Sequence, residues 1–329
     1  MENKTGAAGR IREDWIDVLR AAALLLVIFG HQKSVGYGYF LLTSPVKIPL
    51  FFAISGFVFN ESRRDIRAFA ARLLRHLVVP WLSLGLLGTL AESALTGMRN
   101  LPESLYNLLI GESAWYLPCC IVAECLWFLI LRTMKRESGV ICAAADMCAL
   151  GLLAARMGWL NLWMANRAMI AQVYLLIGYL CRRHRSRLEG FGWRVPVACA
   201  ALYIGLTALS CALYPGKSLD VHQNHYDNVP LCMAIIGAGN VALFTACGRY
   251  MKRAPRWLCW FGQNTLVIYM LHNYSVRLPV HLLRFARLPL LPPLVLAAMV
   301  PVCALYMLLA AVINRFAPEL AGRTRAPRA

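Results

Sequence analysis

The chain has 329 residues, of which 59% are hydrophobic and only 15% are charged. This composition is too apolar for one soluble core and is typical of a bundle of membrane-spanning helices. The formal net charge of +18 would indicate nucleic-acid binding in a soluble domain, so the positions of the basic residues must decide between these two interpretations.

Ten apolar stretches have roughly the length that a membrane-spanning helix needs. They cover residues 16–36, 41–59, 77–96, 115–131, 139–156, 168–181, 195–214, 229–248, 259–276 and 290–313. With a cytoplasmic N-terminus, the segments assigned to the inside carry 25 of the 34 Lys and Arg residues. Because cytoplasmic loops are enriched in Lys and Arg, this predicts an all-α, polytopic membrane helix bundle of about ten spans with both termini cytoplasmic. The net charge is then a topology signal, and no nucleic acid is expected as a partner.

The sequence predicts one integral membrane domain over residues 1–329, with a polar cytoplasmic N-terminus (1–14) and a basic cytoplasmic tail (315–329). The first apolar stretch is too long for a cleavable signal peptide, so we expect it to remain in the protein. The twelve cysteines form no CxxC pair and lie mostly within apolar runs. This pattern favours small buried side chains over disulfides.

The first stretch, IDVLRAAALLLVIFGHQ, contains three ionisable residues. At 100° per residue, Arg20 and His31 lie within about 20° of one helix face, and Asp17 lies one turn before Arg20. Ionisable groups in a spanning helix usually face a cavity or a partner and mark a functional site. Imidazole is the side chain best suited to accept a proton near neutral pH, and Asp17 is spaced to hold Arg20 by an i,i+3 pair.

In the second stretch, PVKIPLFFAISGFVF, small residues interrupt an aromatic run. Two interpretations are open. Ser55 and Gly56 permit a close contact between helices, or they line a passage beside His31 together with Phe51 and Phe52.

Five arginines follow within thirteen residues, at Arg63, Arg64, Arg67, Arg72 and Arg75. The enrichment of basic residues on the cytoplasmic side alone explains a positive charge here. However, arginine rather than lysine at all five positions suits bidentate binding of phosphate. The second interpretation is therefore a polyphosphorylated cytoplasmic ligand.

The outer loop DVHQNHYDN contains two Asp and two His residues between Asp220 and Asp227. No evident rigid helix fixes their geometry, so we expect no metal site. The alternatives are a solvated loop and a mouth that binds a hydroxyl-rich acceptor. Near the other end, His272 lies well inside the ninth stretch, where it is either a hydrogen-bonded core residue or part of a functional site. Glu92, Glu124 and Asp146 also lie within apolar stretches.

Together these segments resemble the acyltransferase-3 family of membrane O-acyltransferases, most closely its branch similar to fucose 4-O-acetylase. Three patterns carry the resemblance over most of the chain: a basic residue, ten residues and a histidine (Arg20, His31); PLFFxISG (Pro49 to Gly56); and GxNTLxIYxxH (Gly262, Asn264, Thr265, Leu266, Ile268, Tyr269, His272). Weaker similarities are Trp115-Tyr116-Leu117, the pair Arg72 and Arg75, and Asn224, Tyr226 and Asn228. The chain departs from the family at Lys47, where a histidine is frequent.

The resemblance implies transfer of an acetyl or similar acyl group from cytoplasmic acetyl-CoA to a hydroxyl of a sugar or surface polysaccharide, in a bacterial plasma membrane and without a metal. His31 would be the base, Arg20 or Ser55 would stabilise the oxyanion, and Asp17 would hold Arg20. The implied contacts with acyl-CoA phosphates and with substrates are Arg63, Arg64, Arg72, Arg75, Phe52, Ser55, Gly56, Trp115, Asn224, Tyr226, Asn264, Tyr269 and His272.

Two other classes of function compete with the enzyme. Several ionisable residues within the spans would also suit a transporter or a small-molecule sensor. A structural partner in a glycan-assembly complex is the third alternative, but a scaffold has no need of the stripe formed by Arg20 and His31.

Overall fold

The computed structural model describes residues 13–32, 36–59, 65–96, 98–217, 219–275 and 277–323. The α-helices are α1 (Asp14–Gly30), α2 (Tyr37–Val58), α3 (Ile66–Leu73), α4 (Val79–Thr96), α5 (Leu101–Ile110), α6 (Tyr116–Thr133), α7 (Glu137–Arg156), α8 (Ala165–Ile170), α9 (Gln172–Arg183), α10 (Arg185–Gly190), α11 (Arg194–Leu213), α12 (Val229–Tyr250), α13 (Arg256–Gln263), α14 (Thr265–Ser275), α15 (Leu278–Phe285) and α16 (Pro292–Phe316). A π-helical segment, η2 (Leu74–Val78), joins α3 to α4, and the short 3-10 turns are η3 (Met98–Asn100), η4 (Leu162–Met164) and η5 (Pro318–Ala321). The predicted all-α class is confirmed.

Seven helices of the described part are long and apolar enough to cross a membrane, or eight if the pair formed by Leu162–Ile170 and Gln172–Arg183, bent by 48°, is one span. Each coincides with a predicted stretch. The two other predicted stretches are helical but differ in form: α1 has 17 residues, and the stretch 259–276 is divided into α13 and α14. The structure therefore supports a multi-pass helical bundle, whereas the count of about ten and the cytoplasmic termini stay predictions.

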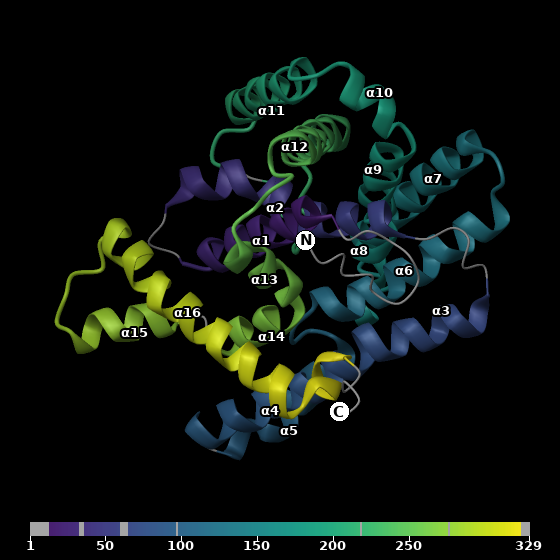
Figure 1. Cartoon of the computed structure of the whole chain (residues 1–329). Coiled ribbons are helices and arrows are strands. Elements are labelled where there is room, and N and C mark those ends of the chain that lie inside the picture. Colours follow the sequence, from purple (N-terminus) through teal and green to yellow (C-terminus); the bar gives the residue numbers. More distant parts are fainter. Residues whose placement is uncertain are drawn as a thin grey trace.

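Figure 1 shows α1 and α2 at the centre of the bundle, with α6 to α9 on one side and α13 to α16 on the other. α1 packs against α2 and α13, and α2 packs against α9. Glycines allow these close approaches. A Cβ atom at Gly56 would overlap the Leu175 carbonyl, and one at Gly262 would overlap the carbonyl of Asp17. The helix-contact interpretation of Gly56 is thus confirmed.

The break between α13 and α14 lies at Asn264, which is buried. Its Nδ2 donates to the Trp260 carbonyl over 2.8 Å. Its Oδ1 accepts from Asn314 Nδ2 at 2.6 Å and from Arg323 Nη2 at 2.8 Å. The amide of Asn264 therefore binds the broken helix to the C-terminal segment, which is a structural role.

Candidate functional site

A cavity of about 220 Å³ lies between α1, α2, α6 and α14, and we call it the central cavity. Its lining residues are Arg20, Ile48, Phe51, Ile54, Ser55, Leu77, Tyr116, Leu117, Cys120, Glu124, Thr265, Leu266 and Tyr269. Arg20, Ser55 and Tyr269 come from the three separate sequence patterns identified above. The fold thus brings one predicted residue of each pattern to a single, largely apolar space.

Arg20 is held at the wall of this cavity by a buried acid. Its Nη1 lies 3.1 Å from Asp17 Oδ1, and the Asp17 side chain is 1% exposed. Asp17 Oδ2 also accepts a hydrogen bond from Gln263 Nε2 over 3.2 Å. The predicted i,i+3 pair is therefore present, and it is tied to the end of α13. Asp17 does not line the cavity itself, so it acts by positioning the guanidinium.

A second ion pair, between Arg72 and Glu124, stands at the central cavity. The Nη2 of Arg72 lies 3.0 Å from Oε2 of Glu124, which is a lining residue. The guanidinium also lies over the rings of Phe59 and Phe69, at 5.2 and 5.6 Å from their centroids. The structure thus gives Arg72 a carboxylate partner that the sequence analysis did not assign, although a lone Glu in the apolar run of α6 was the available signal.

The other members of the arginine run are placed differently. Arg75 is exposed on η2, one turn beyond Arg72. Arg63 and Arg64 lie outside the described residues.

Aromatic rings form the wall between the central cavity and two histidines. Tyr116 and Tyr269 meet with ring centroids 5.6 Å apart. Phe51 and Phe52 pack on Tyr116 at 5.6 and 5.2 Å. On its other side the Tyr269 ring lies 5.2 Å from that of His272. Phe52 therefore supports the wall from behind, while Tyr269 touches both compartments.

His31 and His272 form a pair of imidazoles beyond this wall, with ring centroids 5.4 Å apart. His31 is exposed at the C-cap of α1, whereas His272 is 1% exposed. The carbonyl of Tyr269 lies 2.6 Å from His272 Nδ1 and accepts a hydrogen bond from its N–H, because a carbonyl oxygen has no hydrogen to donate. Nε2 then carries the lone pair of the neutral ring, and it has no hydrogen-bond partner within the described part of the chain.

Arg20 and His31 share a helix face but not a location. Eleven residues of α-helix span about 16 Å along the axis. A helical wheel contains no distance along the axis, so a shared face alone does not bring the two side chains together. In the fold the guanidinium lies at the central cavity and the imidazole lies at the far end of the same helix.

Lys47 and His222 are charged or titratable groups close enough to His31 to act on it electrostatically. A Cβ atom at Gly30 would lie 3.0 Å from Lys47 Nζ, which places the ammonium beside the residue before His31. Lys47 occupies the position where the resemblance leads one to expect histidine. The structure thus retains a nitrogen group at this place, an amine where the resemblance leads one to expect an imidazole.

A family model described as "Acyltransferase domain", that of the acyltransferase-3 family, matches residues 13–311. The chain belongs to the acyltransferase-3 family. No curated protein and no solved structure gives a match. The matched range contains the central cavity and both imidazoles, so these features belong to the domain that defines the family. The membership makes the chain a membrane acyltransferase, and its fucose 4-O-acetylase-like branch stays a prediction.

The outer loop of the acyltransferase is anchored rather than loosely solvated. Arg167 Nε donates to the His222 carbonyl over 2.5 Å, and the hydroxyls of Tyr226 and Tyr174 lie 2.8 Å apart. These bonds seat the His222 ring on Trp115, with centroids 4.8 Å apart. Burial lowers the pKa of His222, and the charge of Arg167 lowers it further, while Asp220 and Glu112 act in the opposite direction.

Asn224 also holds this loop in place. It adopts a positive φ of 54°, and its Nδ2 lies 3.5 Å from Asn166 Oδ1. Asp220 and His225 form an isolated β-bridge across the same loop. Within the described ranges, no group of three or more His, Cys, Asp or Glu residues is placed to hold a metal ion.

A larger cavity, of about 800 Å³, lies between α4, α14, α15 and α16, and we call it the outer cavity. Leu84, Leu87, Ala91, Met270 and Ile313 give it apolar walls, whereas Glu92, Asn273, Arg277 and His281 are polar. Leu271 and Asn273, the two neighbours of His272 on α14, both line it. The sequence analysis missed this cavity, because its residues come from four helices and match no local motif.

Proposed function

We propose that this acyltransferase moves an acetyl or similar short acyl group from cytoplasmic acyl-CoA to a hydroxyl of a sugar or surface glycan. The observation that carries the proposal is the central cavity, where three sequence patterns meet and whose aromatic wall adjoins the pair His31 and His272. A cavity with mostly apolar walls and a few polar side chains, among them Arg20 and Ser55, suits a thioester arm, and the imidazoles beyond it suit proton transfer.

The proposed topology has ten membrane segments with both termini in the cytoplasm of a bacterial cell. The charge asymmetry of the sequence supports it. In this orientation the start of α1 faces the cytoplasm and His31 lies toward the outer side. Donor and acceptor then reach the two compartments from opposite faces of the plasma membrane.

At the cytoplasmic entrance, arginines bind the phosphates of coenzyme A. Arg75 is exposed and carries a guanidinium suited to bidentate phosphate binding, and the sequence places Arg63 and Arg64 nearby. Arg72 lies deeper, where its pair with Glu124 leaves the entrance polar without a net charge. We therefore assign Arg75 the direct contact and Arg72 a positioning role at the mouth of the central cavity.

At the imidazole pair, the acceptor hydroxyl attacks the thioester carbonyl. Its proton passes to the unprotonated nitrogen of His31 while the new C–O bond forms. Collapse of the tetrahedral intermediate breaks the C–S bond, and the departing thiolate of coenzyme A takes up the proton. The same imidazole would be the nucleophile if an acyl-His31 intermediate forms first.

Two neighbouring groups assist this step. His272, whose Nδ1 is held by the Tyr269 carbonyl, presents a lone pair on Nε2 that orients an N–H or O–H donor. Lys47 supplies the nearest positive charge for the oxyanion at this end of α1, because Arg20 lies about 16 Å away along the helix. Arg20 and Ser55 bind the donor earlier on its way through the central cavity.

The acceptor approaches from the outer side. Its hydroxyl groups contact the anchored loop and the neighbouring Trp115: Asn224 offers a hydrogen bond, while the buried Tyr226, bonded to Tyr174, holds the loop in place. The outer cavity offers apolar walls beside polar groups, which fits an acceptor attached to a membrane lipid.

The test is to incubate membranes that contain the protein with labelled acetyl-CoA and to ask which sugar fraction carries the label. Label in a glycan, lost in His31→Ala without loss of membrane insertion, supports the proposal. Full labelling by His31→Ala refutes the assignment of the base. Uptake of substrate into proteoliposomes without any need for acyl-CoA would instead favour the transporter.

A further inference from the structure

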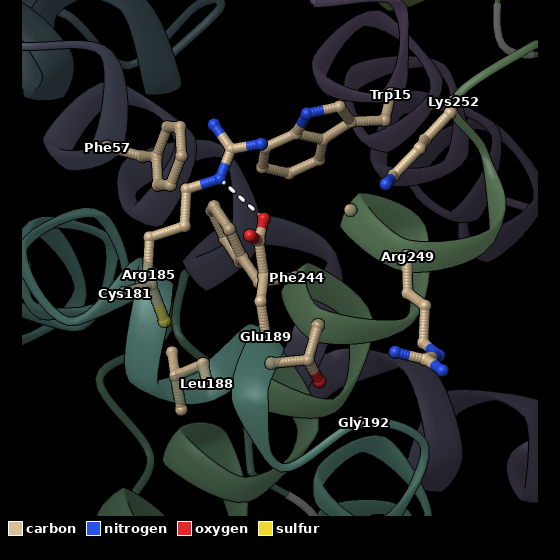
Figure 2. A pocket seen from close by; sticks show the side chains of 12 residues that line it. Trp15, Phe57, Cys181, Arg185, Leu188, Glu189, Gly192, Phe244, Arg249 and Lys252 are labelled. Atoms are coloured by element: carbon tan, nitrogen blue, oxygen red, sulfur yellow. Dashed lines mark hydrogen bonds and ion pairs between the residues drawn. The ribbon is translucent and has the colours of Figure 1, made fainter.

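A third pocket, of about 250 Å³, lies at the end of the bundle where α1 begins and α2 ends (Figure 2). Its lining residues are Trp15, Phe57, Cys181, Arg185, Leu188, Glu189, Gly192, Phe244, Thr245, Gly248, Arg249 and Lys252. None of them lines the central cavity. Trp15 and Arg20 lie about 140° apart around α1, so the two spaces are on different faces of that helix.

The floor of this pocket is aromatic. Trp15 is 5% exposed, and its ring meets those of Phe57 and Phe244 at 5.2 and 6.1 Å in edge-on contacts. Phe57 and Phe244 also touch each other, with centroids 5.4 Å apart. Three buried rings from three different helices give a rigid apolar base.

The rim has an excess of positive charge. Arg185 is already neutralised, because it pairs with Glu13 at 2.7 Å and Glu189 at 2.8 Å. Arg249 and Lys252 are exposed, and neither takes part in an ion pair with another described residue. Figure 2 shows both on the side of the pocket opposite Arg185. The pocket thus offers an anion two cations above an apolar floor.

The surroundings of the pocket point to a membrane surface. Phe191 and Trp193, on either side of the lining residue Gly192, are 65% and 57% exposed. Arg187 and Arg194 lie close by in sequence and are exposed too. Exposed aromatic rings among basic residues are typical of the level of lipid headgroups.

We propose that this pocket binds the phosphodiester group of an anionic phospholipid. The phosphate lies between Arg249 and Lys252, with the arginine fork making paired hydrogen bonds. The glycerol end of the acyl chains rests on Trp15 and its two phenylalanine neighbours. The proposed topology places this lipid in the cytoplasmic leaflet, but binding itself depends on neither acyl-CoA nor an acceptor.

The test measures lipid binding by the full-length protein in nanodiscs of phosphatidylcholine with a minor fraction of phosphatidylglycerol. Lipids that remain bound are identified by native mass spectrometry. The variant Arg249→Ala/Lys252→Ala removes the two rim cations. Its matched control, Arg253→Ala/Arg256→Ala, removes two exposed charges from the same region that do not line the pocket. We expect phosphatidylglycerol to bind about tenfold more weakly in the pocket variant than in the control.

A steric variant keeps the test independent of charge. A Cβ atom at Gly248 would lie 4.0 Å from the Trp15 ring, which leaves room for a side chain to project over the floor. Gly248→Leu should fill the pocket and remove bound phosphatidylglycerol while the thermal unfolding temperature is maintained.

Equal retention of phosphatidylglycerol in the pocket variants and the control would overturn the proposal. Retention of phosphatidylcholine equal to that of phosphatidylglycerol would show that the net charge of the lipid plays no part, and would also overturn the proposal. Displacement by inorganic phosphate or coenzyme A at millimolar concentration would assign it to a soluble phosphate instead. None of these results bears on acyl transfer, which is assayed separately.

Discussion

The rings of His31 and His272 lie 5.4 Å apart although they belong to the first and the ninth apolar stretches of the chain. α1 contributes His31 at its exposed end, and α14 contributes His272 from a buried position. Because one nitrogen of His272 is engaged by the Tyr269 carbonyl, the ring presents a defined tautomer to its neighbour.

The first prediction concerns this pair. His31→Ala should lower kcat for acyl transfer by at least about 100-fold, because general-base catalysis contributes about that much or more. His272→Asn should lower it less while the protein stays folded. The measurement is initial rate with labelled acetyl-CoA, together with the thermal unfolding temperature. His225→Ala, an exposed histidine of the outer loop, is the control and should retain full activity.

The second prediction concerns the ion pair of Asp17 and Arg20. Asp17→Asn keeps the volume but removes the charge that holds the guanidinium, so the protein should lose about 1 to 2 kcal/mol of stability, a value discounted because Arg20 is 30% exposed. A double-mutant cycle with Arg20→Gln measures the coupling in kcat/KM. Strictly additive effects on both stability and activity would show that the two residues act separately.

The third prediction separates packing from site chemistry in adjacent residues. Gly56→Ala places a methyl group against the Leu175 carbonyl and should lower the free energy of unfolding by about 1 to 3 kcal/mol. Ser55→Ala faces the central cavity and should change KM for acyl-CoA with little effect on unfolding. Gly237→Ala serves as the control, because a Cβ atom there meets nothing within 4 Å. If Gly56→Ala had the same free energy of unfolding as the wild type, the packing argument would be wrong.

The fourth prediction concerns donor binding. Arg75→Ala should raise KM for acetyl-CoA about tenfold with kcat nearly unchanged, as expected for loss of uniform binding. Arg132→Ala at the end of α6 removes a charge of the same sign and is the comparison. If KM for acetyl-CoA rises equally in both variants, the effect comes from the loss of positive charge in general, and Arg75 does not contact the phosphates.

The fifth prediction concerns pH. Burial and Arg167 lower the pKa of His222 in the folded protein, so the unfolded chain binds a proton there at a higher pH than the folded chain does. Acidification from about pH 7 therefore destabilises the fold through this residue, and the effect ends once the pH falls below the lowered pKa. His222→Gln should lose less thermal stability than the wild type on acidification. His225→Gln in the same loop should behave like the wild type.

Much of this arrangement could be predicted from the sequence, because the features concerned depend on residues close together in the chain. The pairing of Asp17 with Arg20 is a matter of helical spacing, and the described residues of each predicted apolar stretch are largely helical. The limits are equally physical. A helical wheel contains no axial distance, so the shared face did not reveal that Arg20 and His31 lie about 16 Å apart along α1. The partner of Arg72 and the outer cavity depend on how distant helices meet, which no local pattern records.

Residues of the same sequence motif also have different roles, which the motif alone does not distinguish. Ser55 faces the central cavity while Gly56 faces α9. Tyr269 lines the cavity, whereas Asn264 in the same motif binds the C-terminal segment. Neighbouring positions point in different directions around a helix, and only the packing of the other helices determines what each one meets.

The hydrogen bond from Arg323 to Asn264 shows that the C-terminal segment also stabilises the packing of other helices. A Cβ atom at the adjacent Gly322 would overlap the Arg75 carbonyl, so the same segment also rests on η2. The segment with Gly322 and Arg323 therefore connects η2 to the break between α13 and α14. A protein shortened to residue 311, where the family match ends, would lose both this connection and Asn314. Purification tags are therefore better joined to the N-terminus.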